Sequence, residues 1–197
     1  MIEPVRKGLS LTEAVEWLLR ALKEEGLSVL LCGKSALDFQ GERTGSADID
    51  LAVGIDFSDV VSTLDEYERR GDLHTVGSGR GVVSFVVGGK VTVDVLDVRT
   101  IHPLLFPLLE KEGSTDIPMG SAGDVRAVTR EGYFVLAVMI GRKGFASEKR
   151  DPMRKVRQAW ALFGARTDRK RVDGLLGRLD ARGGLDEALD TEGHGED

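Results

Sequence analysis

The sequence predicts an α+β protein with α/β-type element order, in which a small mixed sheet is followed by a helical C-terminal region. Two observations predict this class. Short apolar runs of strand length alternate with amphipathic segments in the first 128 residues, whereas from Thr129 onward the apolar residues recur only at helical spacing. With 197 residues, 41% of them hydrophobic, the chain is long enough to bury an aliphatic core.

The first 128 residues contain every strand that the pattern predicts. A helix begins after Ser10, where Glu13 completes a capping box, and it ends at Gly26. Ser58 caps a later helix. The other predicted elements of this part are helices at 36–39 and 59–70 and strands at 28–32, 48–55, 73–76, 82–87 and 90–98.

The remaining residues are predicted to be helical, with helices near 130–142, 148–163, 167–180 and 184–190. This pattern divides the chain into a sheet domain over 1–128 and a helical domain over 129–190. Residues 191–197 form an acidic tail that is expected to be disordered.

Composition excludes several classes of protein. A net charge of −6 argues against a protein that simply coats nucleic acid. The single cysteine, Cys32, rules out an intramolecular disulfide framework and a cysteine-based zinc cluster. No apolar run approaches the roughly 20 residues of a membrane-spanning helix. The first residues lack the apolar stretch of a secretory signal, so we expect a cytoplasmic protein.

Positive charge is concentrated in one segment of the chain, because residues 142–178 hold 12 Lys and Arg against 4 Asp and Glu. Within the helix expected at 148–163, Arg150, Arg154 and Arg157 share one face. Such a face suits an RNA or protein acceptor. An ordinary solvated helix face explains the same pattern equally well.

The segment with the clearest chemical meaning is Asp48-Ile49-Asp50. Side chains alternate along a strand, so both carboxylates point to the same side and repel each other. A divalent cation such as Mg²⁺ removes that repulsion. A third carboxylate from the strand at 90–98 would complete a site for two metal ions; alternation leaves both Asp94 and Asp97 as candidates.

Residues 30–53, LLCGKSALDFQGERTGSADIDLAV, resemble the signature of the polymerase-β-like nucleotidyltransferase superfamily. Gly33 and Lys34 are followed by residues 35–47 and then by the Asp48-Ile49-Asp50 motif, which is the spacing of that signature. The fuller string is most similar to the AbiEii-type and minimal nucleotidyltransferases. A glycine turn of this kind leaves backbone N–H groups free to hold phosphate.

The resemblance implies a Mg²⁺-dependent enzyme that moves a nucleoside monophosphate from an NTP such as ATP to a hydroxyl of RNA, protein or a small molecule. The residues that it implies at the nucleotide are Gly33, Lys34, Ser35 and Arg43. The residues that it implies as catalytic ligands of two Mg²⁺ ions are Asp48, Asp50 and Asp94. Attack on the α-phosphate would release pyrophosphate.

Two departures from the family pattern support an alternative. Lys34 stands where the family has Gly or Ser, and the helix reading LAVMIGR (136–142) lacks the Lys that AbiEii-type relatives often carry there. The alternative is a catalytically inactive module of the same fold that binds or regulates a partner, as in a toxin–antitoxin pair. A P-loop is excluded, because Ser28 stands where that motif needs Gly.

Overall fold

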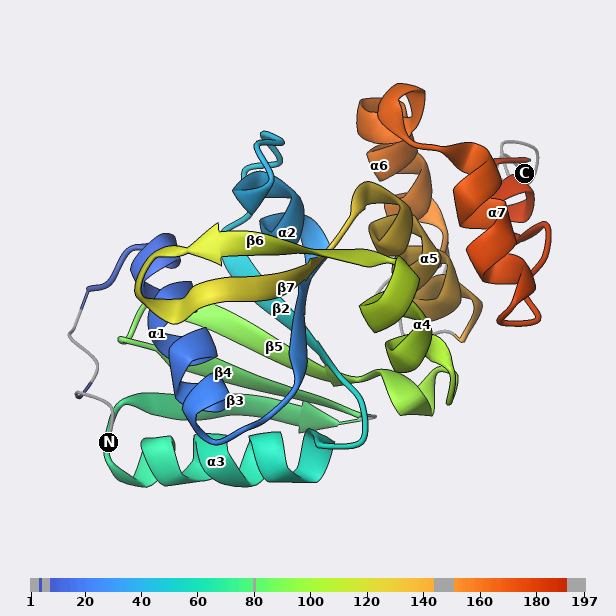
Figure 1. Cartoon of the computed structure of the whole chain (residues 1–197). Coiled ribbons are helices and arrows are strands. Elements are labelled where there is room, and N and C mark those ends of the chain that lie inside the picture. Colours follow the sequence, from blue (N-terminus) through green and yellow to red (C-terminus); the bar gives the residue numbers. More distant parts are fainter. Residues whose placement is uncertain (1–3, 5–7, 80, 144–150, 191–197) are drawn as a thin grey trace.

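A computed structural model of the chain describes residues 4, 8–79, 81–143 and 151–190. Within them, a mixed sheet has the strand order β3-β4-β5-β2-β1-β7-β6 (Figure 1). In chain order its strands are β1 (Val29–Cys32), β2 (Asp48–Val53), β3 (Leu73–Gly79), β4 (Val82–Val87), β5 (Val91–Asp97), β6 (Ser114–Met119) and β7 (Gly123–Val128). The central strands β2 and β5 run parallel to each other, whereas β1 and β2 are antiparallel.

The helices divide between the sheet and the C-terminal region (Figure 1). Those of the sheet region are α1 (Leu11–Glu24), α2 (Gly33–Phe39), α3 (Phe57–Arg69) and α4 (Leu105–Glu112). Those of the C-terminal region are α5 (Arg130–Arg142), α6 (Arg154–Phe163), α7 (Arg169–Gly177) and α8 (Gly184–Asp190). The architecture is thus the predicted one, a mixed sheet followed by helices.

Packing of the sheet follows the alternation of its strands. Ile49 and Leu51 of β2 and Val93 and Val95 of β5 are fully or almost fully buried in the core. Helices α1 and α3 pack together through Trp17 and Tyr67, whose ring centroids lie 5.1 Å apart in an edge-on arrangement. The polar residues between the buried ones, including Asp50 and Asp94, consequently project from the opposite face of the sheet.

The C-terminal helices pack around α5, most of whose residues are buried. Phe134 of α5 meets Trp160 of α6 with ring centroids 5.0 Å apart. The guanidinium of Arg157 in α6 donates to the carbonyl oxygen of Ala188 in α8 at 3.1 Å. None of the helices in the described ranges combines the length and the apolar character needed to cross a membrane.

Several predicted boundaries are confirmed. Ser10 and Glu13 form the expected capping box of α1, and Gly26 follows that helix with a φ of +73°. The helix α5 covers the predicted residues 130–142.

Other predictions were wrong or inaccurate at the element ends. Ser58 does not cap α3, which begins at Phe57 after Asp56 and has no side-chain cap. The strand expected at 48–55 ends at Val53, and β3 continues past residue 76 to Gly79. Helix α7 is shorter than the predicted 167–180. Residues 148–150 and the tail at 191–197 lie outside the described residues.

The largest correction is the hairpin of β6 and β7, which the sequence pattern did not predict. Ser114 pairs with Val128 across this hairpin, and β7 then pairs in parallel with β1. Because β6 is an edge strand, much of it is exposed and polar, so only Ile117 and Met119 are buried and the apolar alternation is weak. Pro118 is tolerated in this strand, because an edge strand has neighbours on one side only and can lack a backbone donor.

Candidate functional site

Three aspartates project from one face of the sheet at the start of β2 and the middle of β5. Asp50 lies directly beside Asp94 in the parallel register of these strands, and Asp48 lies beside Thr92. Side chains in register on adjacent strands share a face, so the structure brings Asp48, Asp50 and Asp94 together. Two residues of one motif and one residue more than forty positions away thus form a carboxylate cluster.

Asp97, the other candidate on β5, is used differently. Its side chain is almost fully buried and accepts from the Arg99 guanidinium, with Arg99 Nη2 2.8 Å from Asp97 Oδ2. It lies an odd number of residues from Asp94 and therefore on the opposite face of the strand. The structure places Asp94, and not Asp97, beside Asp50.

Gly33 directly follows β1 and borders the site beside Asp50. It has a φ of +65°, and its chain neighbour Cys32 pairs with Asp50 across β1 and β2. A Cβ atom added to Gly33 would lie 1.9 Å from Asp50 Oδ2. Only glycine fits here, because both the backbone conformation and the adjacent carboxylate exclude a side chain.

Burial and the neighbouring carboxylates change the proton affinity of Asp50. Burial, together with the charges of Asp48 and Asp94, raises the pKa of Asp50 to about 7. The charges of Lys155 and Lys34 act in the opposite direction. Burial and the charge of Asp50 also raise the pKa of Tyr133 on α5 to about 12. The site therefore favours a positive ligand or a proton at Asp50.

The donor set of the cluster suits Mg²⁺ bound together with substrate phosphates. All of its donors are carboxylate oxygens, and Mg²⁺ in such sites takes one or two carboxylates and completes its shell with phosphate and water. Within residues 8–79, 81–143 and 151–190 no three His, Cys, Asp or Glu side chains stand ready to hold one ion by themselves. The aspartates therefore supply oxygen donors of the kind that Mg²⁺ takes, without forming a complete metal site by themselves.

Hydrogen bonds hold two of the aspartates in place. Ser84 Oγ on β4 donates to Asp94 Oδ1 at 2.6 Å, and Ser46 Oγ donates to Asp48 Oδ1 at 2.9 Å. A carboxylate that accepts such bonds is restrained in orientation before any ligand binds. Ser84 had no role in the sequence-based prediction.

Asp38, which the sequence analysis also missed, organises the loop between α2 and β2. Its carboxylate accepts from Ser46 N at 2.9 Å and from Thr44 Oγ1 at 2.7 Å. Although partial burial raises the pKa of Asp38, the bonds from Thr44 and Ser46 outweigh burial and hold the pKa below its usual value. In the sequence, the only indication of this role was an acidic residue six positions before a Thr in a Gly-rich loop. That pattern is too common to predict a hydrogen-bond network.

The residues predicted to contact phosphate are placed unequally. Lys34 is exposed at the glycine turn, and its charge reaches Asp50. Ser35 is buried, and its hydroxyl donates back to the carbonyl oxygen of Cys32 at 3.2 Å. Arg43 is exposed in the loop that precedes β2. Lys34 is therefore better placed than Ser35 to meet a phosphate.

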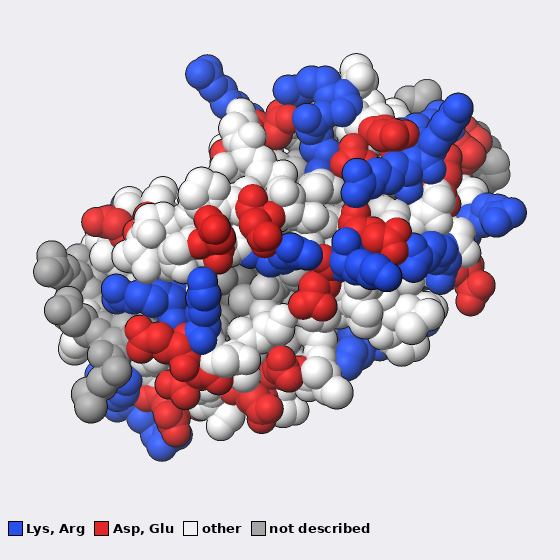
Figure 2. Space-filling view, viewed as in Figure 1, with Lys and Arg blue, Asp and Glu red and all other residues white. Residues whose placement is uncertain are grey.

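The predicted arginine face of the helical region is not a uniform surface. Arg157 is half-buried and pairs with Asp151 besides the Ala188 carbonyl, whereas Arg154 is exposed. Arg150 lies outside the described residues. Figure 2 shows Lys and Arg interspersed with Asp and Glu over the helical region. Lys155 of α6, which the sequence analysis did not single out, is a lysine whose charge acts to lower the pKa of Asp50.

No protein-family model and no curated protein matches the chain. Solved structures do match it. An antigenic nucleotidyltransferase-like protein from Paracoccidioides brasiliensis aligns over 94% of both chains with a TM-score of 0.53 and 15% identity. ANT(2'')-Ia in complex with adenylyl-2''-tobramycin aligns over 86% of this chain and 97% of its own with a TM-score of 0.57 and 12% identity.

A putative nucleotidyltransferase from Thermotoga maritima is also similar, with a TM-score of 0.50 and 12% identity over 68% of this chain and 86% of its own. The first two of these similarities extend over 86% or more of the chain. The chain therefore has the nucleotidyltransferase fold, with a helical C-terminal region.

Proposed function

We propose that the protein is a nucleotidyltransferase that moves a nucleoside monophosphate from an NTP to a hydroxyl group. The observation that carries the proposal is the register of β2 and β5, which sets Asp94 beside Asp50 and Asp48 at the Gly33 turn. The nucleotidyltransferase fold of the chain and its signature at residues 30–53 support the same reading.

In this proposal the three aspartates hold two Mg²⁺ ions together with the nucleotide. The ions, when bound, would neutralise phosphate charge and make the acceptor hydroxyl easier to deprotonate. Lys34 and Lys155, whose charges act on Asp50, would neutralise further phosphate charge. Gly33 lets the backbone turn lie directly against the Asp50 carboxylate, where a side chain would not fit.

The chemistry requires one new P–O bond and one broken one. The acceptor oxygen attacks the α-phosphorus, the bond to the β-phosphate bridging oxygen breaks, and pyrophosphate leaves. In this proposal Asp94, which accepts a hydrogen bond from Ser84, takes the proton of the acceptor hydroxyl. Most of the rate enhancement would come from positioning and charge neutralisation, because the protein forms no covalent bond to the substrate.

The acceptor and the subfamily are finer proposals. We favour an AbiEii-type or minimal nucleotidyltransferase, since the string around Gly33 and Asp48 resembles those proteins. The acceptor is a hydroxyl of RNA, a protein or a small molecule. The crystal structure of ANT(2'')-Ia is a complex with adenylyl-2''-tobramycin.

An inactive binding module is the second candidate. It is favoured by the engaged hydroxyl of Ser35 and by Lys34 at the position where the family carries a small residue. Such a module would bind a partner protein without turning over NTP.

Calorimetric titration of each NTP with Mg²⁺ tests the proposal. Binding by the wild type and its loss in Asp50→Ala, but not in the matched control Asp65→Ala on the exposed side of α3, is the expected result. Transfer of label from α-labelled NTP would then identify the acceptor. Absence of Mg²⁺-dependent binding in the wild type would contradict the proposal and favour the inactive module.

A further inference from the structure

Glu42, in the loop between α2 and β2, joins the sheet region to the helical region. Its carboxylate contacts two arginines from separate helical segments: Glu42 Oε1 lies 3.1 Å from Arg130 Nε, and Glu42 Oε2 lies 2.7 Å from Arg166 Nη2. Arg130 is the first residue of α5, and Arg166 belongs to the 3₁₀ turn that follows α6. The Arg130 guanidinium also donates to the carbonyl oxygen of Arg166.

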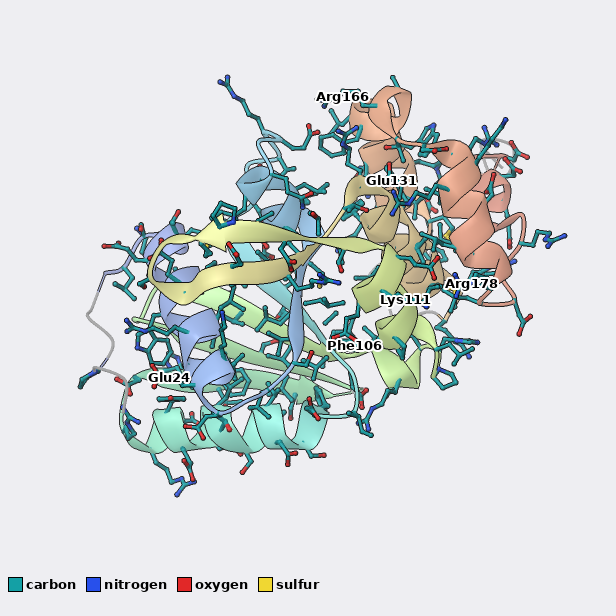
Figure 3. All side chains as sticks on the ribbon, in the orientation of Figure 1. Glu24, Phe106, Lys111, Glu131, Arg166 and Arg178 are labelled. Atoms are coloured by element: carbon teal, nitrogen blue, oxygen red, sulfur yellow. The ribbon has the colours of Figure 1, made fainter. Side chains whose placement is uncertain are left out.

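The side chain of Glu42 is only 9% exposed, although it lies in a loop. A shielded carboxylate with two cationic partners is costly to break, because removing it leaves both arginines facing each other without a counter-charge. Figure 3 labels Arg166 at the part of the helical region that stands opposite α2. The contact therefore ties the end of α6 to the loop that leads into Asp48.

Helix α6 carries a lysine whose charge acts on Asp50. Lys155 lies in the first turn of α6, and the charge of Lys155 lowers the pKa of Asp50 across the space between the two regions. The Arg166 contact fixes the other end of the same helix. Holding one end of a rigid helix against the α2–β2 loop limits how far its other end can move from Asp50.

A second connection between the regions provides a comparison. Glu112 at the end of α4 accepts from Arg178, the residue that follows α7, and the side chains are 36% and 55% exposed. That pair holds α7 rather than α6, and it is solvated, so its rupture should cost little. It is a matched carboxylate–arginine bridge that does not involve the helix with Lys155.

We propose that Glu42 is a positioning residue that clamps the C-terminal end of α6 to the α2–β2 loop and so holds Lys155 over the aspartate cluster for binding of a nucleoside triphosphate. This inference rests on the proposed function for its ligand. Its structural part, the fixed distance between α6 and the sheet region, does not depend on that function.

A double-mutant cycle tests the link to Lys155. Glu42→Gln and Lys155→Met should each weaken binding of Mg²⁺–ATP by about 10-fold, which is about 1.4 kcal/mol. In the Lys155→Met background, Glu42→Gln should add little, because both changes remove the same interaction. Glu112→Gln is the control and should bind as the wild type does. Fully additive losses, or wild-type affinity in Glu42→Gln, would overturn the proposal.

A distance measurement tests the clamp without nucleotide. Cys32 is buried, so spin labels can be placed at Asp65→Cys on α3 and Ala161→Cys on α6, both exposed. Glu42→Gln should broaden this distance distribution or shift it to longer values, and Arg166→Gln should do the same if Glu42→Gln does not fold. An unchanged distribution in the folded variant refutes the clamp. A wild type that binds no nucleotide refutes the proposed function instead, and the distance result then decides the clamp alone.

Discussion

Replacement of Gly33 by alanine should destabilise the protein more than the same replacement at another glycine of equal backbone conformation. Gly33 and Gly26 have φ values of +65° and +73°. A Cβ at Gly33 would lie 1.9 Å from Asp50 Oδ2, whereas a Cβ at Gly26 meets nothing within 4 Å. Gly26→Ala is therefore a control for backbone strain alone.

The expected costs follow from these two situations. A residue with a side chain in the left-handed region costs about 1–2 kcal/mol, and this applies to both variants. The overlap with Asp50 adds about 1–3 kcal/mol at Gly33, as overpacking in a filled site does. We therefore expect a loss of about 1–2 kcal/mol for Gly26→Ala and about 2–5 kcal/mol for Gly33→Ala.

Urea unfolding followed by circular dichroism measures both free energies of unfolding. A further prediction follows, because the excess loss of stability at Gly33 comes from overlap with one side chain, that of Asp50. In an Asp50→Ala background the excess should disappear, so that Gly33→Ala costs no more than Gly26→Ala does. Equal costs for the two single variants, or an excess that persists without the Asp50 carboxylate, would refute the placement of that carboxylate against the glycine turn.

Three further predictions concern the same framework. The pKa of Asp50 is raised to about 7 in the folded protein from an ordinary value of 3.8. Between these two pH values the folded state keeps a proton that the unfolded state releases. The metal-free wild type should therefore lose up to about 4 kcal/mol of stability as pH rises from 4 to 7. Asp50→Asn should lack this loss when the free energy of unfolding is measured by urea titration in the presence of a chelator. If the stability of the wild type changed with pH in the same way as that of Asp50→Asn, the prediction would be contradicted. Asp38→Ala should lower the free energy of unfolding by about 1–3 kcal/mol, because it leaves N–H groups of the loop without an acceptor. It should also speed proteolysis of the α2–β2 loop. Unchanged cleavage would contradict the role of the Asp38 hydrogen bonds in ordering that loop. Gly132→Ala should lower the melting temperature markedly, since its Cβ would lie 2.0 Å from the Gly113 carbonyl oxygen, whereas Gly174→Ala has open space and should have little or no destabilising effect.

Much of the fold could be predicted from local pattern. The capping box at Ser10, the strand alternation around Ile49 and the helical spacing from Thr129 onward each depend on residues close together in the chain. The β6–β7 hairpin was not predicted, because its edge strand β6 is largely exposed and polar and so shows little alternation of apolar and polar residues. Its place beside β1 is decided by pairing with a strand about one hundred residues earlier.

The candidate site divides in the same way. The sequence by itself determined that Asp48 and Asp50 share a face and that a glycine precedes them at the turn, because alternation and spacing are local properties of one segment. Only the tertiary structure decided that Asp94 rather than Asp97 stands beside them, since that depends on the register of two distant strands. It also decided that the charge of Lys155 acts on Asp50 and that Glu42 joins two arginines, because both interactions arise only when the helical region packs against the sheet region.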